Sequence, residues 1–463
     1  MAACLPSEGG MKHLLLAFLA LSFAVPVHAD PLADAADGAL AKDTLAWDFV
    51  EGITTEVGPR QAGTDAEARG RAWAVGWLRR QGFAGVADEP FLMRTWVRGQ
   101  EQAEIVAPFA QPMRITALGN SAATPADGLT ADVVGFMSYA DLEAAPVGSL
   151  AGKIAFISHD MRVTQDGSGY SFAGPARWTG PALAASKGAV ATVIRSIGTE
   201  NHRTPHTGGT TFPEGVDPIP AGALSNPDAD NLERMLERAG DRPVIMKVVL
   251  TPRWLGDTQS GNVVAEITGS NASLPAVLVA CHLDSWDLGT GAIDDASGCG
   301  IVAAAAKAVA STGQPLRTIR LLFAGAEEVG VHGGEAFAEA HGEEPVAAAL
   351  ESDFGADRIW RLDSNFRESN PELHGRLMQS VARFGVAGST AEATGGADIV
   401  IARDQQTAIV DLQQDGTRYF DLHHTPDDTL DKVDAAQLRQ NVAVWTQVLG
   451  ILANEPRAIK QVD

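Results

Sequence analysis

The chain of 463 residues has few basic side chains, few cysteines and, after its first thirty residues, no long apolar run. Its 35 lysines and arginines stand against 58 aspartates and glutamates, which gives a formal net charge of −23. Nucleic acids and anionic membranes are bound by basic surfaces, so this balance argues against both as partners. Without a long apolar run, the mature chain also lacks a candidate for a membrane-spanning helix.

The three cysteines are too few to suggest a disulfide-stapled fold. Cys4 lies in a segment that we expect to be removed. Cys281 lies in a predicted buried strand, and Cys299 lies in the helix predicted after it. We therefore interpret both as small core residues and not as a disulfide or a metal-binding pair.

Residues 1–29 have the pattern of a secretory signal peptide. Met11-Lys12-His13 precedes an apolar run over residues 14–25, and the small-residue sequence Val27-His28-Ala29 follows it. The run is short for a membrane span, and Met11 is the predicted initiator. The mature protein is therefore expected to begin near Asp30 and to be secreted or periplasmic.

The length of the chain and its 45% hydrophobic content suit two domains. We expect residues 30–121 and 253–463 to form the two parts of one larger domain. Its expected strands are at 91–97, 261–267, 276–280, 317–323 and before Asp353, and its expected helices are at 66–81, 298–310, 333–340, 372–384 and 435–453. Strands and helices that alternate at this spacing are typical of an α/β sheet with helices on both faces.

We expect residues 122–252 to form a smaller module that is inserted into this domain. Expected strands at 133–136, 154–157, 189–194 and 244–250 alternate with a helix at 180–187 and a polar loop at 196–215. His202 and His206 lie in that loop with H-x-x-x-H spacing. The loop has no helical periodicity, so we do not expect these histidines to bind a metal.

Four groups of reactive side chains follow residue 280: His282 with Asp284, Asp294-Asp295, Glu327-Glu328 with Asp353, and His423-His424. Each group has an ordinary structural explanation when taken alone, such as capping of the following helix by the aspartate pair. Three of these positions, however, follow apolar runs that predict strands. Ligands of α/β sheets bind beyond the carboxyl ends of the strands. We therefore expect these side chains to meet at one crevice.

Imidazoles and carboxylates without a thiolate suit a divalent cation such as Zn²⁺. The set has one carboxylate more than a single ion needs, which favours two ions that share a bridging ligand. Such a pair polarises a substrate carbonyl and makes a nucleophile from water near neutral pH. The reaction also needs a base that is not a ligand, and adjacent Glu327 and Glu328 can provide one base and one ligand.

Four motifs resemble those of the M28 metallopeptidases, which are co-catalytic zinc exopeptidases: H-L-D-S at 282–285, G-A-I-D-D-A-S-G at 291–298, G-A-E-E at 325–328 and H-T-P-D-D-T at 424–429. Residues 54–60, 282–289, 351–353 and 415–425 resemble the carboxypeptidase Q branch. Ala296-Ser297 departs from it, because that branch often has glycine there. The resemblance covers nearly the whole mature chain. It implies a mixed, twisted central sheet and identifies the insert as a protease-associated (PA) domain.

The resemblance implies two zinc ions per chain and five metal ligands. His282 and Asp353 would hold one ion, Glu328 and His424 the other, and Asp294 would bridge them.

The resemblance also implies roles for the neighbouring residues. Glu327 would be the general base, and Asp284 would hydrogen-bond the second ring nitrogen of His282 and so fix its tautomer. Asp295 is expected to cap the following helix, and His423 is expected to pack beside the ligands. Residues 394–398 and Arg418-Tyr419 are candidate pocket loops, since glycines allow close backbone approach.

The implied function is that of an exported di-zinc exopeptidase acting on dipeptides and other small peptides. Which peptide terminus is recognised stays open, so an aminopeptidase acting on longer peptides is an alternative. A non-catalytic receptor of the transferrin-receptor type is disfavoured because every metal and base position holds a suitable residue. A single-zinc glutaminyl cyclase is disfavoured by the complete two-ion set. The insert is expected to wall the cleft, to mediate a homodimer, or both.

Overall fold

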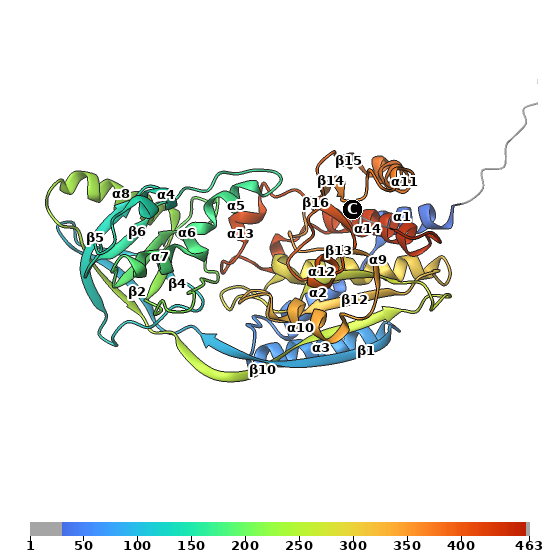
Figure 1. The fold of residues 1–463 in the computed structure, drawn as a ribbon, viewed down its shortest axis with the longest axis horizontal. Helices are drawn as coiled ribbons and strands as arrows, with labels where there is room; N and C mark the ends of the chain where they lie inside the picture. The colour runs from blue at the N-terminus through green and yellow to red at the C-terminus, as the bar shows by residue number, and fades with distance from the viewer. Residues whose placement is uncertain (1–29, 460–463) are drawn as a thin grey trace, which may run out of the picture.

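The computed structural model describes residues 30–459, so the predicted signal peptide at residues 1–29 lies outside the described residues. The described chain forms two lobes that are joined by a long two-stranded ribbon (Figure 1). Both ends of the described chain lie in the larger lobe, and the smaller lobe is the insert. Among residues 30–459, no helix has the length and apolar character needed to cross a membrane.

The larger lobe is built on a mixed eight-stranded sheet within the described residues, in the order β1-β10-β12-β11-β13-β16-β14-β15. The parallel strands at its centre are β11 (Ala276–His282), β12 (Ile319–Ala324), β13 (Val346–Glu351) and β16 (Ala408–Gln414). The flanking strands are β1 (Ala84–Val97), β10 (Arg253–Ile267), β14 (Ile359–Ser364) and β15 (Ala387–Gly388). The predicted mixed α/β sheet is confirmed.

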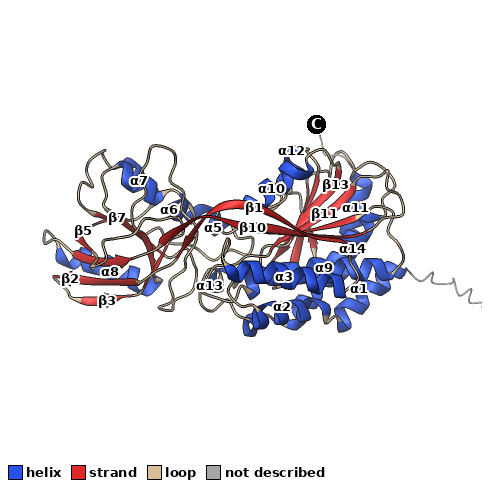
Figure 2. Cartoon of the chain, turned by 90° about the horizontal axis from the view of Figure 1, so that it is seen from below, coloured by secondary structure: helices blue, strands red, loops and turns tan. Residues whose placement is uncertain are grey.

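Helices cover both faces of this sheet (Figure 2). One face carries α1 (Pro31–Lys42), α2 (Leu45–Glu56), α3 (Asp65–Arg80), α9 (Ser297–Ser311) and α14 (Ala435–Ala453). The other face carries α10 (His332–His341) and α12 (Val400–Asp404), while α11 (Pro371–Val381) packs against α14 and β15.

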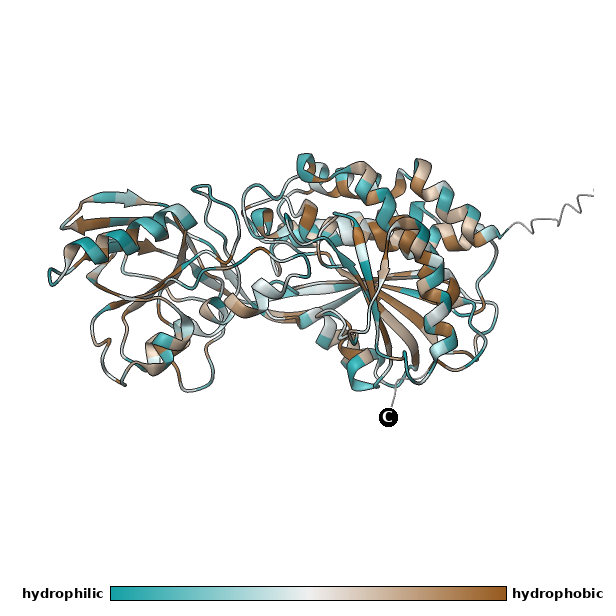
Figure 3. Cartoon of the chain, turned by 90° about the horizontal axis from the view of Figure 1, so that it is seen from above, coloured by the Kyte–Doolittle hydropathy of each residue, from teal (hydrophilic) through white to brown (hydrophobic). Residues whose placement is uncertain are grey.

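Alternating strand residues explain the two layers. Val277 and Val279 of β11 belong to the core under α9 and α14, whereas Leu278 and Ala280 belong to the core under α10 and α12. Both faces of a central strand are therefore apolar, which is why these strands read as continuous hydrophobic runs in the sequence. The hydropathy colouring shows this apolar centre beneath the more polar helices (Figure 3).

The insert contains a second mixed sheet, in the order β3-β2-β9-β5-β6-β7-β8-β4 over the described range. Its strands are β2 (Glu101–Ala107), β3 (Gln111–Met113), β4 (Ile115–Ala117), β5 (Leu129–Phe136), β6 (Ile154–Ile157), β7 (Ala191–Arg195), β8 (Ala221–Leu224) and β9 (Ile245–Leu250). Its helices are α4 (Tyr139–Ala144), α5 (Ser168–Ala173), α6 (Pro175–Trp178), α7 (Gly180–Ser186) and α8 (Asn226–Ala239). Because β2 pairs with β9, this sheet reaches upstream of the predicted boundary at residue 122.

β1 and β10 form the ribbon that links the lobes. They pair antiparallel from Ala84 opposite Glu266 to Val97 opposite Arg253, so the chain enters the insert along one strand and returns along the other. The ribbon positions the insert at the carboxyl end of the parallel strands.

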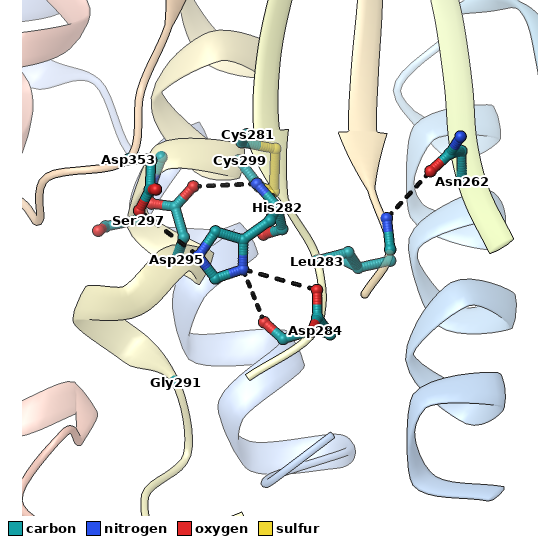
Figure 4. Close-up of a disulfide and its surroundings, with 12 residues drawn as sticks. Asn262, Cys281, His282, Leu283, Asp284, Gly291, Asp295, Ser297, Cys299 and Asp353 are labelled. Carbon is teal, nitrogen blue, oxygen red and sulfur yellow. Dashed lines mark hydrogen bonds and ion pairs between the residues drawn. A yellow bond between two sulfur atoms is a disulfide. The ribbon is translucent and has the colours of Figure 1, made fainter. Parts of the chain in front are cut away.

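The structure corrects the interpretation of the cysteines. Cys281 at the end of β11 and Cys299 in the first turn of α9 form a disulfide, with their Cα atoms 5.2 Å apart (Figure 4). The loop between β11 and α9 folds back on itself, so residues 18 positions apart come within bonding distance. Both side chains are fully buried, as expected for core residues.

We expect thiol titration of the mature protein in denaturant to find no free thiol before reduction and two after it. The disulfide closes a loop of 18 residues, which restricts the unfolded chain. Replacing both cysteines by alanine is therefore expected to lower the free energy of unfolding by about 3 kcal/mol, as measured by urea denaturation. Two reactive thiols in the unreduced protein would contradict the disulfide.

Candidate metal centre

The predicted site residues meet at the carboxyl ends of three parallel strands. His282 ends β11, Glu327 and Glu328 follow β12, and Asp353 follows β13. Neighbouring parallel strands deliver their following residues to the same edge of the sheet, so these side chains come together as predicted.

Two loops complete the group. Asp294 lies in the turn η1 (Ala292–Ala296) that precedes α9, and the peptide bond between Asp294 and Asp295 is cis. His424 follows the short helix α13 (Tyr419–Leu422) and has a φ of 61°.

Asp294 turns one carboxylate oxygen towards each of two histidines. Its Oδ1 lies 2.9 Å from Nε2 of His282, and its Oδ2 lies 3.3 Å from Nε2 of His424. Asp353 Oδ1 is 3.4 Å from the same His282 nitrogen, and Glu328 Oε2 is 2.9 Å from the same His424 nitrogen. The five residues therefore form two groups that share Asp294, and each group has nitrogen and oxygen donors that could hold one divalent cation.

The backbone around Asp294 is fixed by buried charged side chains. The Asp428 carboxylate accepts hydrogen bonds from the N–H groups of Ile293 and Asp294, at 2.6 and 3.2 Å. Burial and the charge of Asp294 raise the pKa of Asp428 to about 7. The fully buried Arg60 donates to three backbone carbonyls of loop 283–291. These contacts fix the loop that carries Asp294.

Asp284 contacts the second ring nitrogen of His282, but through its backbone. The Asp284 carbonyl oxygen lies 3.1 Å from His282 Nδ1, whereas the carboxylate Oδ1 is 3.7 Å away (Figure 4). The expected hydrogen bond to the carboxylate is therefore made by the carbonyl instead. The carboxylate accepts the N–H of Glu327 at 3.1 Å, because the loop after β12 passes beside it. Asp284 thus fixes the His282 ring and also ties the Glu327 loop to the site.

Asp295 and His423 lie beside the shared aspartate. Asp295 accepts hydrogen bonds from the N–H groups of Gly298 and His282, so it caps α9 and joins that helix to β11 (Figure 4). His423 stacks on His424 with 3.4 Å between ring centroids, and its Nε2 is 3.7 Å from Asp294 Oδ2.

His423 could replace Glu328 in the second group, since its nitrogen also lies within reach of Asp294 and His424. Glu328 is the better candidate because it lies closer to the His424 nitrogen, at 2.9 Å. Its Oε1 is also buried without a hydrogen-bond partner.

The charges of the cluster shift its titration. Burial lowers the pKa of His424, but attraction by Glu328 and Asp294 outweighs it and raises the value to about 9. Burial likewise opposes protonation of His282, yet Asp353 and Asp294 raise its pKa well above the usual range. Burial raises the pKa of Asp294, but the hydrogen bond from His282 and the interaction with His424 hold it well below the usual range. Both imidazoles therefore bind a proton in the place where a cation would bind.

The insert holds the loop that carries His424. Thr207 donates its N–H to the His424 carbonyl at 3.1 Å and accepts from His424 Nδ1 at 3.2 Å. His206 Nδ1 lies 2.7 Å from the His423 carbonyl, and the Thr199 hydroxyl donates to the Asp421 carboxylate. With its Nδ1 hydrogen given to Thr207, His424 leaves Nε2 free to bind a cation.

A cavity of about 370 Å³ opens onto both groups and is walled by both lobes. The insert contributes Tyr170, Arg177 and Trp178, and the larger lobe contributes Glu327 and Tyr419 among others. Burial raises the pKa of Glu327 well above its usual range. Tyr419, which the sequence predicted as a pocket residue, lines this cavity.

Arg418, Glu351 and residues 394–396 lie beside the cavity and not in its wall. Arg418, predicted with Tyr419 as a pocket residue, instead pairs with Asp357 at 2.6 Å. Glu351 accepts hydrogen bonds from the N–H groups of Asp398 and Ile399, and burial raises its pKa to about 8. Residues 394–396 line a neighbouring hollow that also includes Asp353. The sequence signal for Glu351 was its place in the 351–353 motif, while nothing local marked Asp398 as buried.

We expect cation binding to release protons. His424, with a pKa of about 9, is protonated at pH 7 and must lose that proton to become a ligand. The apparent affinity for Zn²⁺ should therefore rise between pH 6 and pH 9. Calorimetric titrations at pH 7 in buffers of different ionisation enthalpy should show release of at least one proton per chain. A pH-independent affinity without proton release would contradict this electrostatic account.

Comparison with known proteins agrees with this geometry. Residues 262–449 match the model of peptidase family M28. The chain is 31% identical to carboxypeptidase Q of Bos taurus over 405 residues, which cover 87% of this chain and 84% of that protein. Against carboxypeptidase Q of Homo sapiens the identity is 30% over the same shares of both chains.

Solved structures share the whole fold. A peptidase M28 precursor from Shewanella amazonensis superposes with a TM-score of 0.89 at 42% identity, covering 93% of this chain and 98% of that one. A zinc aminopeptidase from Bacillus subtilis gives a TM-score of 0.64 at 18% identity, over 91% and 98% of the two chains, and supports the fold alone. The site geometry, the family match and the similarity along most of the chain lead to one assignment. The chain belongs to peptidase family M28, a family of metallopeptidases.

Proposed function

We propose that this chain is an exported di-zinc exopeptidase that releases single amino acids from dipeptides and other small peptides. The observation that carries the proposal is the Asp294 carboxylate, whose two oxygens face two separate histidine–carboxylate groups. The name of the carboxypeptidase Q relatives supports an exopeptidase, and the imidazole and carboxylate donors of the site support zinc as the metal. The pattern of residues 1–29 supports export, and the mixed α/β insert is consistent with a PA domain.

The residues present fit two zinc ions. His282 and Asp353 would hold one, Glu328 and His424 the other, and Asp294 would contact both. Zn²⁺ binds imidazole nitrogen and carboxylate oxygen. Oδ2 of Asp294 and Oε1 of Glu328 are buried without a hydrogen-bond partner in the described structure. Buried carboxylate oxygens without a partner are costly, and bound cations would remove that cost.

Bound zinc would polarise the scissile carbonyl and lower the pKa of water, and the remaining work falls to side chains of the chain. Glu327, on the cavity wall, accepts a proton from the attacking water and returns it to the leaving amine. Its raised pKa favours proton acceptance by this carboxylate. Asp284 keeps the Glu327 loop in place through the Glu327 N–H.

Replacing the base should separate metal binding from catalysis. We expect Glu327→Gln to retain both zinc ions, measured by elemental analysis, and to lower kcat on an unblocked dipeptide by about 10³-fold or more. The amide has nearly the same shape as the carboxylate but cannot accept the proton from water.

A matched control is Glu335→Gln on α10, where the side chain is 67% exposed and does not line the cavity. This variant should keep the wild-type rate. A Glu327→Gln enzyme with two zinc ions and near-normal turnover would overturn the assigned base.

A further inference from the structure

Arg177 is a buried cation on the wall of the cavity with too few hydrogen-bond acceptors. It lies in α6 of the insert, and only 4% of the residue is exposed. Its Nη2 donates to the Tyr170 hydroxyl, and its Nη1 reaches the Thr207 carbonyl at the long distance of 3.5 Å. Nε has no hydrogen-bond partner. A guanidinium has five N–H donors, so most of its donors lack a strong acceptor.

His424 does not supply the missing acceptor. Arg177 Nη1 lies 3.4 Å from His424 Nδ1. That ring nitrogen gives its own hydrogen to the Thr207 carbonyl, and a nitrogen that carries a hydrogen cannot accept another.

The other buried arginines of the described chain have carboxylate partners or several carbonyl partners. Arg71 also has an Nε without a partner, but its Nη1 pairs with Asp88 at 2.6 Å. Arg195 pairs with Asp230 and Glu233, at 2.6 and 2.9 Å. Arg60 and Arg317 each donate to three backbone carbonyls. Among residues 30–459, Arg177 has neither arrangement. Because a buried unpaired charge is costly, we infer that a ligand supplies its anion.

Arg177 is also the one lysine or arginine among the described residues that line this cavity. The acidic lining residues are Asp294, Glu327, Glu328 and Asp353, which surround the proposed zinc sites. The guanidinium lies beside Nδ1 of the imidazole whose Nε2 faces Asp294 and Glu328. An anion bound at Arg177 would therefore lie within about one amino-acid residue of a peptide carbonyl at the metal pair.

The guanidinium is held in place before a ligand binds. It lies against the backbone of Gly208, where an added Cβ would fall 2.5 Å from Arg177 Cζ. On another side it lies 5.3 Å from the centroid of the Tyr170 ring. A planar guanidinium in a fixed position matches the two oxygens of a carboxylate and loses little freedom on binding.

We propose that Arg177 binds the C-terminal carboxylate of the substrate and selects peptides in which a single residue follows the scissile bond. The proposal rests on the proposed function, because it places that bond at the two zinc groups. Arg177 then makes the enzyme a dipeptidase or carboxypeptidase. The insert sets the specificity, while the larger lobe provides the catalytic residues.

The test compares an unblocked dipeptide with the same dipeptide amidated at its C-terminus, on the zinc-loaded mature chain. Hydrogen bonds to charged groups contribute enough to change affinity about 10- to 100-fold. The wild type should therefore favour the free acid by about this factor in kcat/KM. Arg177→Met should lose the preference by slowing the free acid alone, and Arg177→Lys should retain part of it because it keeps the charge without the fork.

The control is Arg242→Met, an exposed arginine of the insert that does not line the cavity and packs over Phe109. It should keep the wild-type preference. Zinc content, measured on every variant, detects damage to the His424 loop. Equal slowing of both substrates by Arg177→Met, with zinc lost, would show a merely structural role and overturn the proposal.

The two proposals fail in different ways. A wild type that cleaves the amide as fast as the free acid overturns the role of Arg177 and leaves a zinc exopeptidase of the aminopeptidase kind. No chelator-sensitive turnover of either substrate overturns the proposed function. In that case, calorimetric titration of the zinc-loaded Glu327→Gln variant with the free-acid and the amidated dipeptide tests whether Arg177 binds the carboxylate. Tighter binding of the free acid, lost on adding Arg177→Met, supports the carboxylate site, and equal binding of acid and amide refutes it.

Discussion

The metal centre depends on the direction in which the Asp294 carboxylate is held. Its two oxygens divide four other side chains into two groups, so a rotation of this carboxylate would break both groups at once. Arg60 fixes the backbone just before the turn and Asp428 fixes it within the turn, while Asp295 anchors the following helix to β11. Buried polar networks of this kind are rigid when every member is satisfied. Among the five proposed ligands, Asp294 Oδ2 and Glu328 Oε1 are the buried side-chain atoms left without a hydrogen-bond partner in the described structure.

The two lobes divide the work. Strand ends of the larger lobe position His282, Glu327, Glu328 and Asp353, whereas the loop that carries His424 is held by the insert through Thr207. The insert therefore takes part in the site, because it fixes the ring of one proposed ligand and supplies Arg177 to the cavity wall. A movement along the β1–β10 ribbon would change the cavity and the orientation of His424 together.

Features set by nearby residues could be predicted from the sequence. The runs before His282 and Glu327 are apolar on both faces, so their strands, and the edge where they end, followed from pattern alone. The expected helix at 435–453 agrees with α14 at both ends, and that at 298–310 differs from α9 by one residue at each end.

Features set by distant contacts could not be predicted. The first half of β1 is mostly exposed and lacks alternation, so only 91–97 was expected of a strand that begins at Ala84. The disulfide required the loop after β11 to fold back, although a chain expected to be exported does reach an oxidising compartment. No neighbouring residue in the sequence marks Arg177 as a pocket residue. Its buried position without an anionic partner becomes visible only in the folded chain, where both lobes wall the cavity. Helix α8 was not predicted, although Ser225 caps its start and its hydroxyl accepts a hydrogen bond from the backbone N–H of Asp228.

Anomalous diffraction at the zinc edge, on crystals of the mature chain loaded with zinc, would test the account most directly. The account predicts two peaks per chain, one beside His282 and Asp353 and the other beside Glu328 and His424, with Asp294 in contact with both. A single peak, or a second peak away from His424, would contradict the two-faced role of Asp294 and with it the proposed di-zinc site.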